Sequence, residues 1–400
     1  MKNKKILTIA ICSLLQVGSS ATAADSIVEA FSNGKADVSF RYRFEYVNQD
    51  GFDLNAKAST LKTRVNFKTE TYHDFSFFIE ADNVTEVFED DYNSGSGNSP
   101  GNVDHPVIAD PQGTEINQVW VKYDFSKGNS VKVGRQRILL DNQRFVGGVG
   151  WRQNEQTYDG ISGSFKLGGS DLFVAYISNV NRIFGDDVAA GDHENSSALF
   201  NWSNKFEDFG TLTAYYYDID NKDAAAFSTA TIGIKFKGKV ESFNYGIEYA
   251  SQNDNANNPV DFSANYWRLD AGYKFEQVTA YGGYEVLEGD SNVAGSMFRT
   301  PLATLHAFNG WADKFLATPQ DGLEDLFVGV KGKVDKFNWN LVYHDFVAQD
   351  SSRDLGSEID FLVGMKVNKN VSLLAKAAFY YADEHATDTS KVWFMVTTNF

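Results

Sequence analysis

Apolar and polar residues alternate along most of this chain with a period of two. In the first strand-like segment the apolar side chains share one parity: Val38, Phe40, Tyr42, Phe44 and Tyr46. The positions between them are polar and include Arg41, Arg43 and Glu45. Successive side chains of a β-strand point to opposite faces, so this pattern predicts a strand with one apolar and one polar face.

The alternation continues in segments of about ten residues, which is the pattern of transmembrane β-barrel strands. Eighteen segments are predicted, at 36–46, 59–71, 75–85, 115–125, 130–137, 158–167, 171–180, 194–203, 210–219, 229–237, 242–252, 264–275, 278–287, 325–334, 337–347, 357–367, 371–382 and 390–400. The patterns of 158–167 and 194–203 are the weakest, and without these two segments the count is sixteen.

Short turns and long loops alternate between the segments. The short connections include His73-Asp74 and Asp335-Lys336, whereas the long ones include 86–114 and 288–324. A soluble sandwich has no reason to gather its long loops at one end, but an outer-membrane barrel has short periplasmic turns and long extracellular loops. We therefore predict an all-β fold, a transmembrane antiparallel β-barrel of about eighteen strands in the outer membrane of a Gram-negative bacterium.

The first 23 residues have the features of a secretory signal peptide. Three lysines precede an apolar stretch at 6–17, and Ala21-Thr22-Ala23 forms a small-residue cleavage site. The predicted division is a signal peptide at 1–23 and a barrel at 24–400. The only cysteine, Cys12, lies in the signal, so the barrel has neither a disulfide framework nor a thiol nucleophile.

The net charge narrows the choice of partners. The formal charge of −17 becomes −20 when the three lysines of the signal are removed. Because phosphate binding needs a basic surface, this balance argues against nucleic acid as a partner. Basic residues nevertheless occur on the polar faces of the strands, and we expect four of them to line the lumen: Arg43, Arg64, Lys122 and Arg268. They could form cross-strand ion pairs along the wall, or a positive constriction inside an acidic barrel.

The segment 131–160 carries a further cluster of guanidinium groups. Its arginines lie among Gln, Asn and Gly residues: Arg135, Arg137, Arg144 and Arg152. Planar guanidinium groups beside amides suit a surface that binds carboxylates or sugar hydroxyls. Arg135 and Arg137 share the parity of Val131 and Val133. Strict alternation therefore cannot turn the pair of arginines inward together with the pair of valines. We predict a β-bulge at Gly134 that brings the arginines into the lumen.

Two long loops are also unusual. Between Pro301 and Pro319 the loop 288–324 is predicted to contain a short helix that could fold over or into the lumen, because apolar residues recur near helical spacing. Arg299 precedes this helix and belongs to its polar side. The loop 86–114 is acidic and rich in Gly, Ser and Asn, which favours a solvated loop. The alternative is that it binds Ca²⁺ or bridges lipopolysaccharide through divalent ions. No other cofactor is predicted.

The sequence contains no pairing of a nucleophile with a base. None of the six histidines belongs to an H-E-x-x-H motif or follows a G-x-S-x-G serine. An outer-membrane hydrolase is therefore the least favoured function, and no catalytic residue is predicted.

Three segments resemble the alginate-export family of outer-membrane barrels. They are V-G-R-Q-R at 133–137, W-R-Q-N-E-Q-T-Y-D-G at 151–160 and T-P-L-A-T-L-H-A-F-N-G-W-A-D-K-F-L at 300–316. The resemblance covers nearly the whole chain after the signal. It implies a monomeric channel of eighteen strands that passes an anionic uronic-acid polymer through an arginine-lined pore narrowed by loops. Arg135, Arg137 and Arg152 fall on the matching motifs, with Arg144 between them.

We expect a passive outer-membrane channel for small anionic solutes, or for sugar-acid and oligosaccharide chains. The alternative is a general or cation-leaning diffusion porin, which the net charge favours if every arginine is paired. The expected partners are outer-membrane lipid and lipopolysaccharide, the anionic solute, and the barrel-assembly machinery through Phe400. Phe400 is in phase with Phe394 and closes the last alternating segment.

Overall fold

The computed structural model describes residues 23–207 and 209–400. Of the predicted signal peptide, residues 1–22 lie outside the described part of the chain. The described residues form eighteen strands: β1 (Lys35–Gln49), β2 (Ala56–Lys68), β3 (Phe75–Asp91), β4 (Gly113–Ser126), β5 (Asn129–Gln136), β6 (Thr157–Leu167), β7 (Ser170–Asn181), β8 (Asp192–Phe206), β9 (Gly210–Ile219), β10 (Thr229–Val240), β11 (Phe243–Asp254), β12 (Ser263–Phe275), β13 (Val278–Leu287), β14 (Leu323–Val334), β15 (Phe337–Val347), β16 (Asp354–Lys366), β17 (Val371–Tyr381) and β18 (Thr389–Asn399).

Within residues 23–207 and 209–400, helical structure is confined to short pieces. They are α1 (Ile27–Ser32) and the 3₁₀ turns η1 (Ala189–Gly191), η2 (Ala225–Phe227) and η3 (Leu305–Ala307). None of the described helices is long and apolar enough to cross a membrane.

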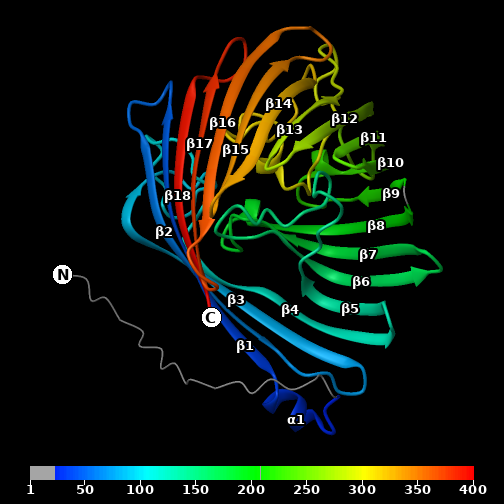
Figure 1. Cartoon of the computed structure of the whole chain (residues 1–400). Coiled ribbons are helices and arrows are strands. Elements are labelled where there is room, and N and C mark those ends of the chain that lie inside the picture. The colour runs from blue at the N-terminus through cyan, green and yellow to red at the C-terminus, as the bar shows by residue number, and fades with distance from the viewer. Residues whose placement is uncertain (1–22, 208) are drawn as a thin grey trace.

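The strands form one closed antiparallel barrel (Figure 1). Each strand pairs with the next in the chain, and β1 pairs with β18 from Ser39 opposite Asn399 to Gln49 opposite Thr389. Closure gives every strand a neighbour on both sides, as a hydrocarbon environment requires. The predicted count of eighteen is confirmed. The two weakest segments are strands β6 and β8, so the alternative count of sixteen is wrong.

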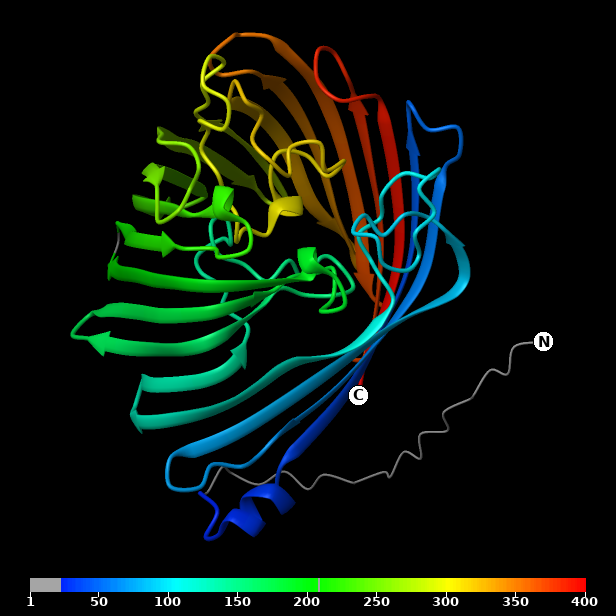
Figure 2. The ribbon, with the colours of Figure 1, turned by 180° about the vertical axis from the view of Figure 1, so that it is seen from behind.

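The two ends of the barrel differ, as Figures 1 and 2 show. Connections such as 127–128, 168–169 and 335–336 are tight turns at one end. The opposite end carries the long connections, which include 92–112, 137–156 and 288–322. In outer-membrane barrels the short-turn end faces the periplasm and the long-loop end faces the exterior.

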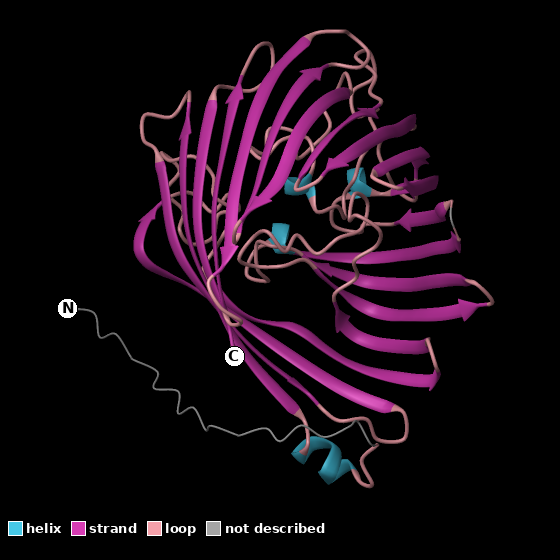
Figure 3. Cartoon of the chain, viewed as in Figure 1, coloured by secondary structure: helices cyan, strands magenta, loops and turns pink. Residues whose placement is uncertain are grey.

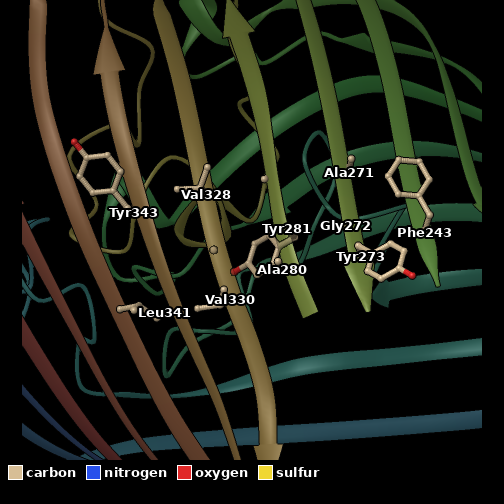
Figure 4. A pocket seen from close by; sticks show the side chains of 12 residues that line it. Phe243, Ala271, Gly272, Tyr273, Ala280, Tyr281, Val328, Val330, Leu341 and Tyr343 are labelled. Carbon is tan, nitrogen blue, oxygen red and sulfur yellow. The ribbon is translucent and has the colours of Figure 1, made fainter. Parts of the chain in front are cut away.

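The outward face is apolar and the inward face is polar. Outward-pointing Ile232 and Ile247 are 62% and 52% exposed, whereas inward-pointing Lys235 and Glu248 are buried in an ion pair with Nζ 2.6 Å from Oε2. Exposed apolar side chains form a belt around the closed barrel. Such a belt is favourable when lipid covers it. On β11 to β15 this face has a depression of about 640 Å³, which Figure 4 shows with Tyr273 and Tyr343 on its strands. It faces lipid and is not part of a route through the lumen.

The buried core lies inside the barrel. Loops 137–156 and 288–322 enter the lumen (Figures 2 and 3) and contribute Phe145, Phe298 and Phe315 to a cluster with inward-facing strand residues. A barrel of this size encloses more space than wall side chains alone can fill. The loops fill part of that space, so they determine the width of the lumen.

The predicted helix between Pro301 and Pro319 is wrong. Only η3 is helical there, and the chain then takes left-handed backbone angles at Asn309 (φ 54°) and Asp313 (φ 62°). The barrel wall supplies the reason. Two carboxylates of strand β16 accept hydrogen bonds from backbone N–H groups of this segment. Ala312 N donates to Glu358 Oε1 at 2.7 Å, and Trp311 N donates to Asp360 Oδ2 at 3.2 Å. These hydrogen bonds replace those of a helix.

The predicted bulge at Gly134 is also wrong. Strand β5 keeps its register there, with Gly134 opposite Trp120 on β4 and Gly160 on β6. A side chain at Gly134 would meet the carbonyl oxygen of Val119 at 2.3 Å, and its φ of +122° favours glycine. Glycine is therefore needed here because neighbouring strands approach closely. It does not mark an extra residue inserted into the strand.

The loop predicted at 86–114 is only partly solvated. Strand β3 extends to Asp91, and the inner part of the connection buries Tyr92, Ile108 and Asp110 completely. The interpretation as a solvated loop is therefore wrong for these residues. Asp110 instead reaches the basic residues of the lumen, as described below.

Candidate functional site

Loops 137–156 and 288–322 hold each other inside the barrel. Val146 and Leu302 form an isolated parallel bridge, and Gly147 N donates to the Leu302 carbonyl at 2.8 Å. The Thr304 hydroxyl accepts from Val149 N at 3.0 Å and donates to Gln143 Oε1 at 2.8 Å. The two loops, which contain most of the residues that carried the family resemblance, are thus one unit in space.

Arg152 lies at the centre of this unit and is surrounded by carboxylates. Its guanidinium is 3.0 Å from Glu45 Oε2 on β1, 2.9 Å from Asp313 Oδ2 and 4.0 Å from Asp110 Oδ2. The acids come from the wall and from two loops. Burial lowers the stability of the charged guanidinium, but these three acids outweigh it and raise the pKa of Arg152. Arg152 therefore joins loops 92–112, 137–156 and 288–322 to the wall.

Aromatic rings and cations form a layer beside Arg152. The Trp151 ring stacks on His306 at 4.5 Å between centroids, and the Arg43 guanidinium lies 4.3 Å from the Trp151 centroid. Arg43 also bonds Asp110 at 3.0 Å, so it is fully buried and paired. Lys376 Nζ lies 3.6 Å from the Trp311 centroid and 2.7 Å from His306 Nε2.

His306 is neutral in this layer. Burial lowers its pKa to about 3, and neighbouring Lys376 and Arg152 act in the same direction against the opposing effect of Asp313. Nδ1 lies 2.6 Å from Asp313 Oδ1, so a neutral ring donates to Asp313 from Nδ1 and accepts from Lys376 at Nε2.

Glu155 gathers a second group of cations against β2 and β3. Arg64 Nη2 lies 2.9 Å from Glu155 Oε1 and 2.6 Å from Asp82, and Arg137 Nε donates to Glu155 Oε2 at 2.6 Å. Lys62 is 3.7 Å from the same carboxylate. Burial disfavours the carboxylate, but the charges of Arg64, Lys62 and Arg137 outweigh burial and lower the pKa of Glu155 to about 2.

The predicted pore-lining residues on and directly after β4 and β5 differ in where they lie. Arg135 lies opposite Val119 and Asp159, shares the outward parity of Val133 and binds Asp159 at 2.8 Å, so its prediction as a lumen residue is wrong. Arg137 turns inward because β5 has ended at Gln136. Lys122 faces the lumen near the short-turn end and pairs with Asp124.

Asn309 joins loop 288–322 to Arg144 and to the barrel wall. Its side-chain oxygen accepts from Arg144 at 3.0 Å, and its amide donates to Glu285 at 2.8 Å and Asp325 at 3.0 Å. Arg144 also binds Glu285 at 2.8 Å and stacks on Phe308, with 4.8 Å from its guanidinium carbon to the ring centroid. All four polar side chains are at least nine-tenths buried.

Asn309 lines two cavities. The inner cavity, of about 180 Å³, lies deeper along β12 to β15 and is lined by Arg268, Tyr281, Asn340 and His344. Arg268 there binds Asp270 at 3.2 Å and lies 3.7 Å from Glu285. The outer cavity, of about 100 Å³, lies where the long loops begin.

The outer cavity differs from the inner one in charge. Arg144, Arg182 and Arg299 line it, together with mostly apolar residues. No acidic residue is among the described residues that form its wall. Sequence reasoning identified Arg299 but missed Arg182, because a single arginine after a strand gives no periodic signal. It also missed the carboxylates that pair the predicted arginines, since Asp110, Glu285 and Asp313 lie far from them in the chain.

The described residues contain no group of three or more His, Cys, Asp or Glu side chains arranged to hold a metal ion. Calcium on the extracellular loops stays a prediction.

Comparison with known proteins assigns the chain to a family. The model of the Alginate export family matches residues 35–288, which is more than half of the 400 residues. This chain belongs to the alginate-export family. The match includes strands β1 to β13 and the loop 137–156. No curated protein matches this alginate-export family member.

Solved structures support the same fold for this alginate-export family member. OccAB2 of Acinetobacter baumannii has a TM-score of 0.69 and 18% identity, covering 93% of this chain and 99% of its own. OccK9 (OpdG) of Pseudomonas aeruginosa has a TM-score of 0.68 and 12% identity, with coverages of 93% and 99%. The outer membrane protein opdK of the same species has a TM-score of 0.67 and 14% identity, with coverages of 92% and 98%. The family and the fold place the protein among outer-membrane channels and not among enzymes.

Proposed function

We propose that this protein is a passive outer-membrane channel for small anionic solutes, with sugar acids and short oligosaccharides as candidate solutes. The observation that carries the proposal is the order of guanidinium groups along the two cavities. Arg182 and Arg299 line the outer cavity, Arg144 also lines it and binds Asn309, which borders both cavities, and Arg268 lines the inner cavity. Successive cationic groups that line narrow polar spaces lower the free energy of an anion along its path.

Electrostatics in the rest of the lumen argue for a second candidate, a cation-leaning diffusion porin. Arg43, Arg64, Arg137 and Arg152 each bind at least one carboxylate, so most of the predicted positive constriction is neutralised. The net charge of the chain is negative as well. The two candidates differ in the sign of ion selectivity.

Reversal potentials in a planar bilayer under a KCl gradient distinguish them. We expect anion preference, and we expect Arg268→Gln to lower the anion-to-cation permeability ratio about threefold because one charge near the path is removed. Arg353→Gln is the matched control, since this arginine lies on the 348–353 connection and binds Asp321. Cation preference that Arg268→Gln leaves unchanged would refute anion selectivity and support the cation-leaning porin. Absence of any conductance from folded protein would refute a passive channel altogether.

A further inference from the structure

The outer cavity combines cationic groups with an apolar wall. Its apolar part includes Phe227, Met297, Leu305 and Phe315, which come from loops 220–228 and 288–322. Leu287 and Leu323 complete it at the ends of β13 and β14. This composition differs from that of the inner cavity, where Glu285, Asp325 and Asn340 contribute polar oxygen atoms.

Two of its arginines lack an acidic partner. Among the described residues, no carboxylate lies within salt-bridge distance of Arg182 or Arg299, in contrast to Arg144, which binds Glu285. The Arg299 side chain donates only to the Gly295 carbonyl at 3.1 Å, and its Nε has no partner in the described structure. The Arg182 guanidinium lies 5.7 Å from the Phe227 ring centroid. A partly buried guanidinium without a carboxylate is costly unless an anion completes it.

The structure fixes the position of Arg299. Buried Gln252 on β11 accepts from Arg299 N at 2.8 Å and donates to its carbonyl at 2.8 Å. Gln252 in turn donates to Thr231 on β10 at 2.8 Å. The backbone of Arg299 is therefore held to the barrel wall, so its side chain starts from a defined point at the cavity.

We propose that the outer cavity binds a monocarboxylate with an apolar body, whose carboxylate meets Arg182 and Arg299 and whose hydrocarbon part meets Phe227, Met297 and Leu305. This inference rests on the proposed function and narrows its solute. A volume of about 100 Å³ suits one small ring or short chain. A sugar acid of the same size would leave its hydroxyl groups against apolar side chains without hydrogen bonds, and that loss disfavours it.

Binding of two matched carboxylates tests the proposal. Cyclohexanecarboxylate and glucuronate each carry a carboxylate on a six-membered ring, but only glucuronate has ring hydroxyls. Calorimetry on the purified, full-length barrel in detergent should show cyclohexanecarboxylate binding at least tenfold more tightly than glucuronate or uncharged cyclohexylmethanol. We expect Arg182→Gln and Arg299→Gln each to weaken it about tenfold, as loss of one charge-assisted hydrogen bond does. Arg353→Gln should have no effect.

Three outcomes would overturn the proposal: equal or tighter binding of glucuronate, binding that both arginine variants leave unchanged, or no binding by a barrel whose heat-dependent gel migration shows that it is folded. Phe227→Ser separates the contribution of the apolar wall from that of the arginines. It should weaken the binding of cyclohexanecarboxylate and leave the binding of glucuronate unchanged. Calorimetry does not depend on ion flow. If reversal potentials show anion preference while this binding fails, only the apolar-carboxylate inference is wrong; loss of anion preference refutes the proposed function instead.

A second, independent observation concerns α1 at the short-turn end of the barrel (Figure 1). The helix is held to the β2–β3 connection, because Glu70 N donates to the Ala30 carbonyl at 3.0 Å and Asn33 donates to Glu70 at 2.9 Å. The Phe31 ring stacks on Phe67 and Phe77 with centroid separations of 6.1 Å each. Phe67 lies opposite Ile79, and Phe77 lies opposite Val121, which is exposed on the outward face.

The apolar face of α1 therefore continues the lipid-facing surface of the barrel. Ile27, Val28 and Phe31 share one side of the helix and are 61%, 76% and 50% exposed. We propose that this side lies in the periplasmic leaflet of the outer membrane at the level of the lipid headgroups. An amphipathic helix at that depth buries its apolar side in the acyl boundary and keeps its polar side in water.

Fluorescence of single-cysteine variants tests this placement. The only natural cysteine, Cys12, lies in the predicted signal, so a label at Val28→Cys is unique in the processed chain. In vesicles of brominated phosphatidylcholine we expect an NBD label at Val28 to be quenched at least twofold more than one at Glu29→Cys on the polar side. Equal quenching at both positions in folded barrels would refute the placement.

Discussion

At the level of single residues, the lumen contains buried basic side chains that are matched to carboxylates. Removal of a charge from water costs several kcal/mol, and a close partner of opposite sign repays this cost only when the geometry is good. Arg152 has Glu45 and Asp313 at 3.0 and 2.9 Å, and Arg144 has Glu285 at 2.8 Å. Arg182 and Arg299 depart from this rule at the outer cavity, which is why we assign a ligand there.

The Glu155 cluster should make the stability of the barrel sensitive to acid. The folded pKa of about 2 lies below the ordinary value of 4.5, so the stabilisation is fully present above pH 4.5 and is lost as the pH falls towards 2. We expect Glu155→Gln to lower stability by about 2 kcal/mol at pH 7, because a charge-assisted hydrogen bond is lost. The difference from the unchanged protein should shrink towards zero between pH 4.5 and 2.

Thermal unfolding followed by tryptophan fluorescence at several pH values measures this difference. Glu276→Gln is the control, because it removes one carboxylate from an exposed turn. A difference between Glu155→Gln and the unchanged protein that stays constant from pH 7 to pH 2 would contradict the assignment.

At the level of elements, loop 288–322 acts as a structured insert in the barrel. Its segment 308–313 has left-handed residues and few backbone bonds of its own, and it is held by carboxylates of β13, β14 and β16. Its conformation thus depends on the wall that surrounds it. We infer that the same contacts limit the width of the lumen at Asn309.

Asn309→Ala should widen the lumen at this position. The substitution removes three hydrogen bonds and places alanine at a φ of 54°, which L-residues other than Asn and Asp rarely adopt. We expect single-channel conductance to rise about twofold, because narrow pores are limited by their smallest cross-section. Asn292→Ala, at an exposed position of the same loop, should leave conductance unchanged. Equal conductance of the two variants would show that Asn309 does not set the width.

At the level of the whole molecule, closure of the sheet makes the fold compatible with lipid. Strand β18 completes the ring against β1, and the Phe400 backbone donates to and accepts from Val38 at 2.9 and 3.2 Å. The Phe400 ring is 67% exposed and contacts Phe40 edge-on at 6.4 Å. An exposed ring contributes little to folded stability, so we propose that it serves recognition by the assembly machinery.

Phe400→Ala separates assembly from stability. The variant keeps both backbone hydrogen bonds with Val38, so we expect the thermal stability of the purified barrel to change by less than about 0.5 kcal/mol. The amount of folded barrel in outer membranes should nevertheless fall several-fold, as measured by heat-dependent gel migration of membrane fractions. Val334→Ala, at an exposed outward position of another strand, is the control. Equal amounts of both variants would contradict a role in assembly.

The sequence by itself determined the barrel. Lipid and water impose opposite demands on the two faces of each strand, so period-two alternation, strand count and loop asymmetry are local properties of the chain. Even the weakest segments became β6 and β8, because ring closure requires every strand to pair on both sides. The segments 133–137, 151–160 and 300–316 likewise indicated the family that the match over 35–288 established.

Only the tertiary structure decided the chemistry of the lumen. The side on which Arg135 lies depends on register, and the end of β5 turns Arg137 inward. The partners of Arg152 are 107 and 161 residues away in sequence, and the helical pattern after Pro301 gives way to bonds from the distant carboxylates of β16. Alternation records which medium a side chain faces, but not which distant side chain meets it, and charge pairing in the lumen depends on the latter.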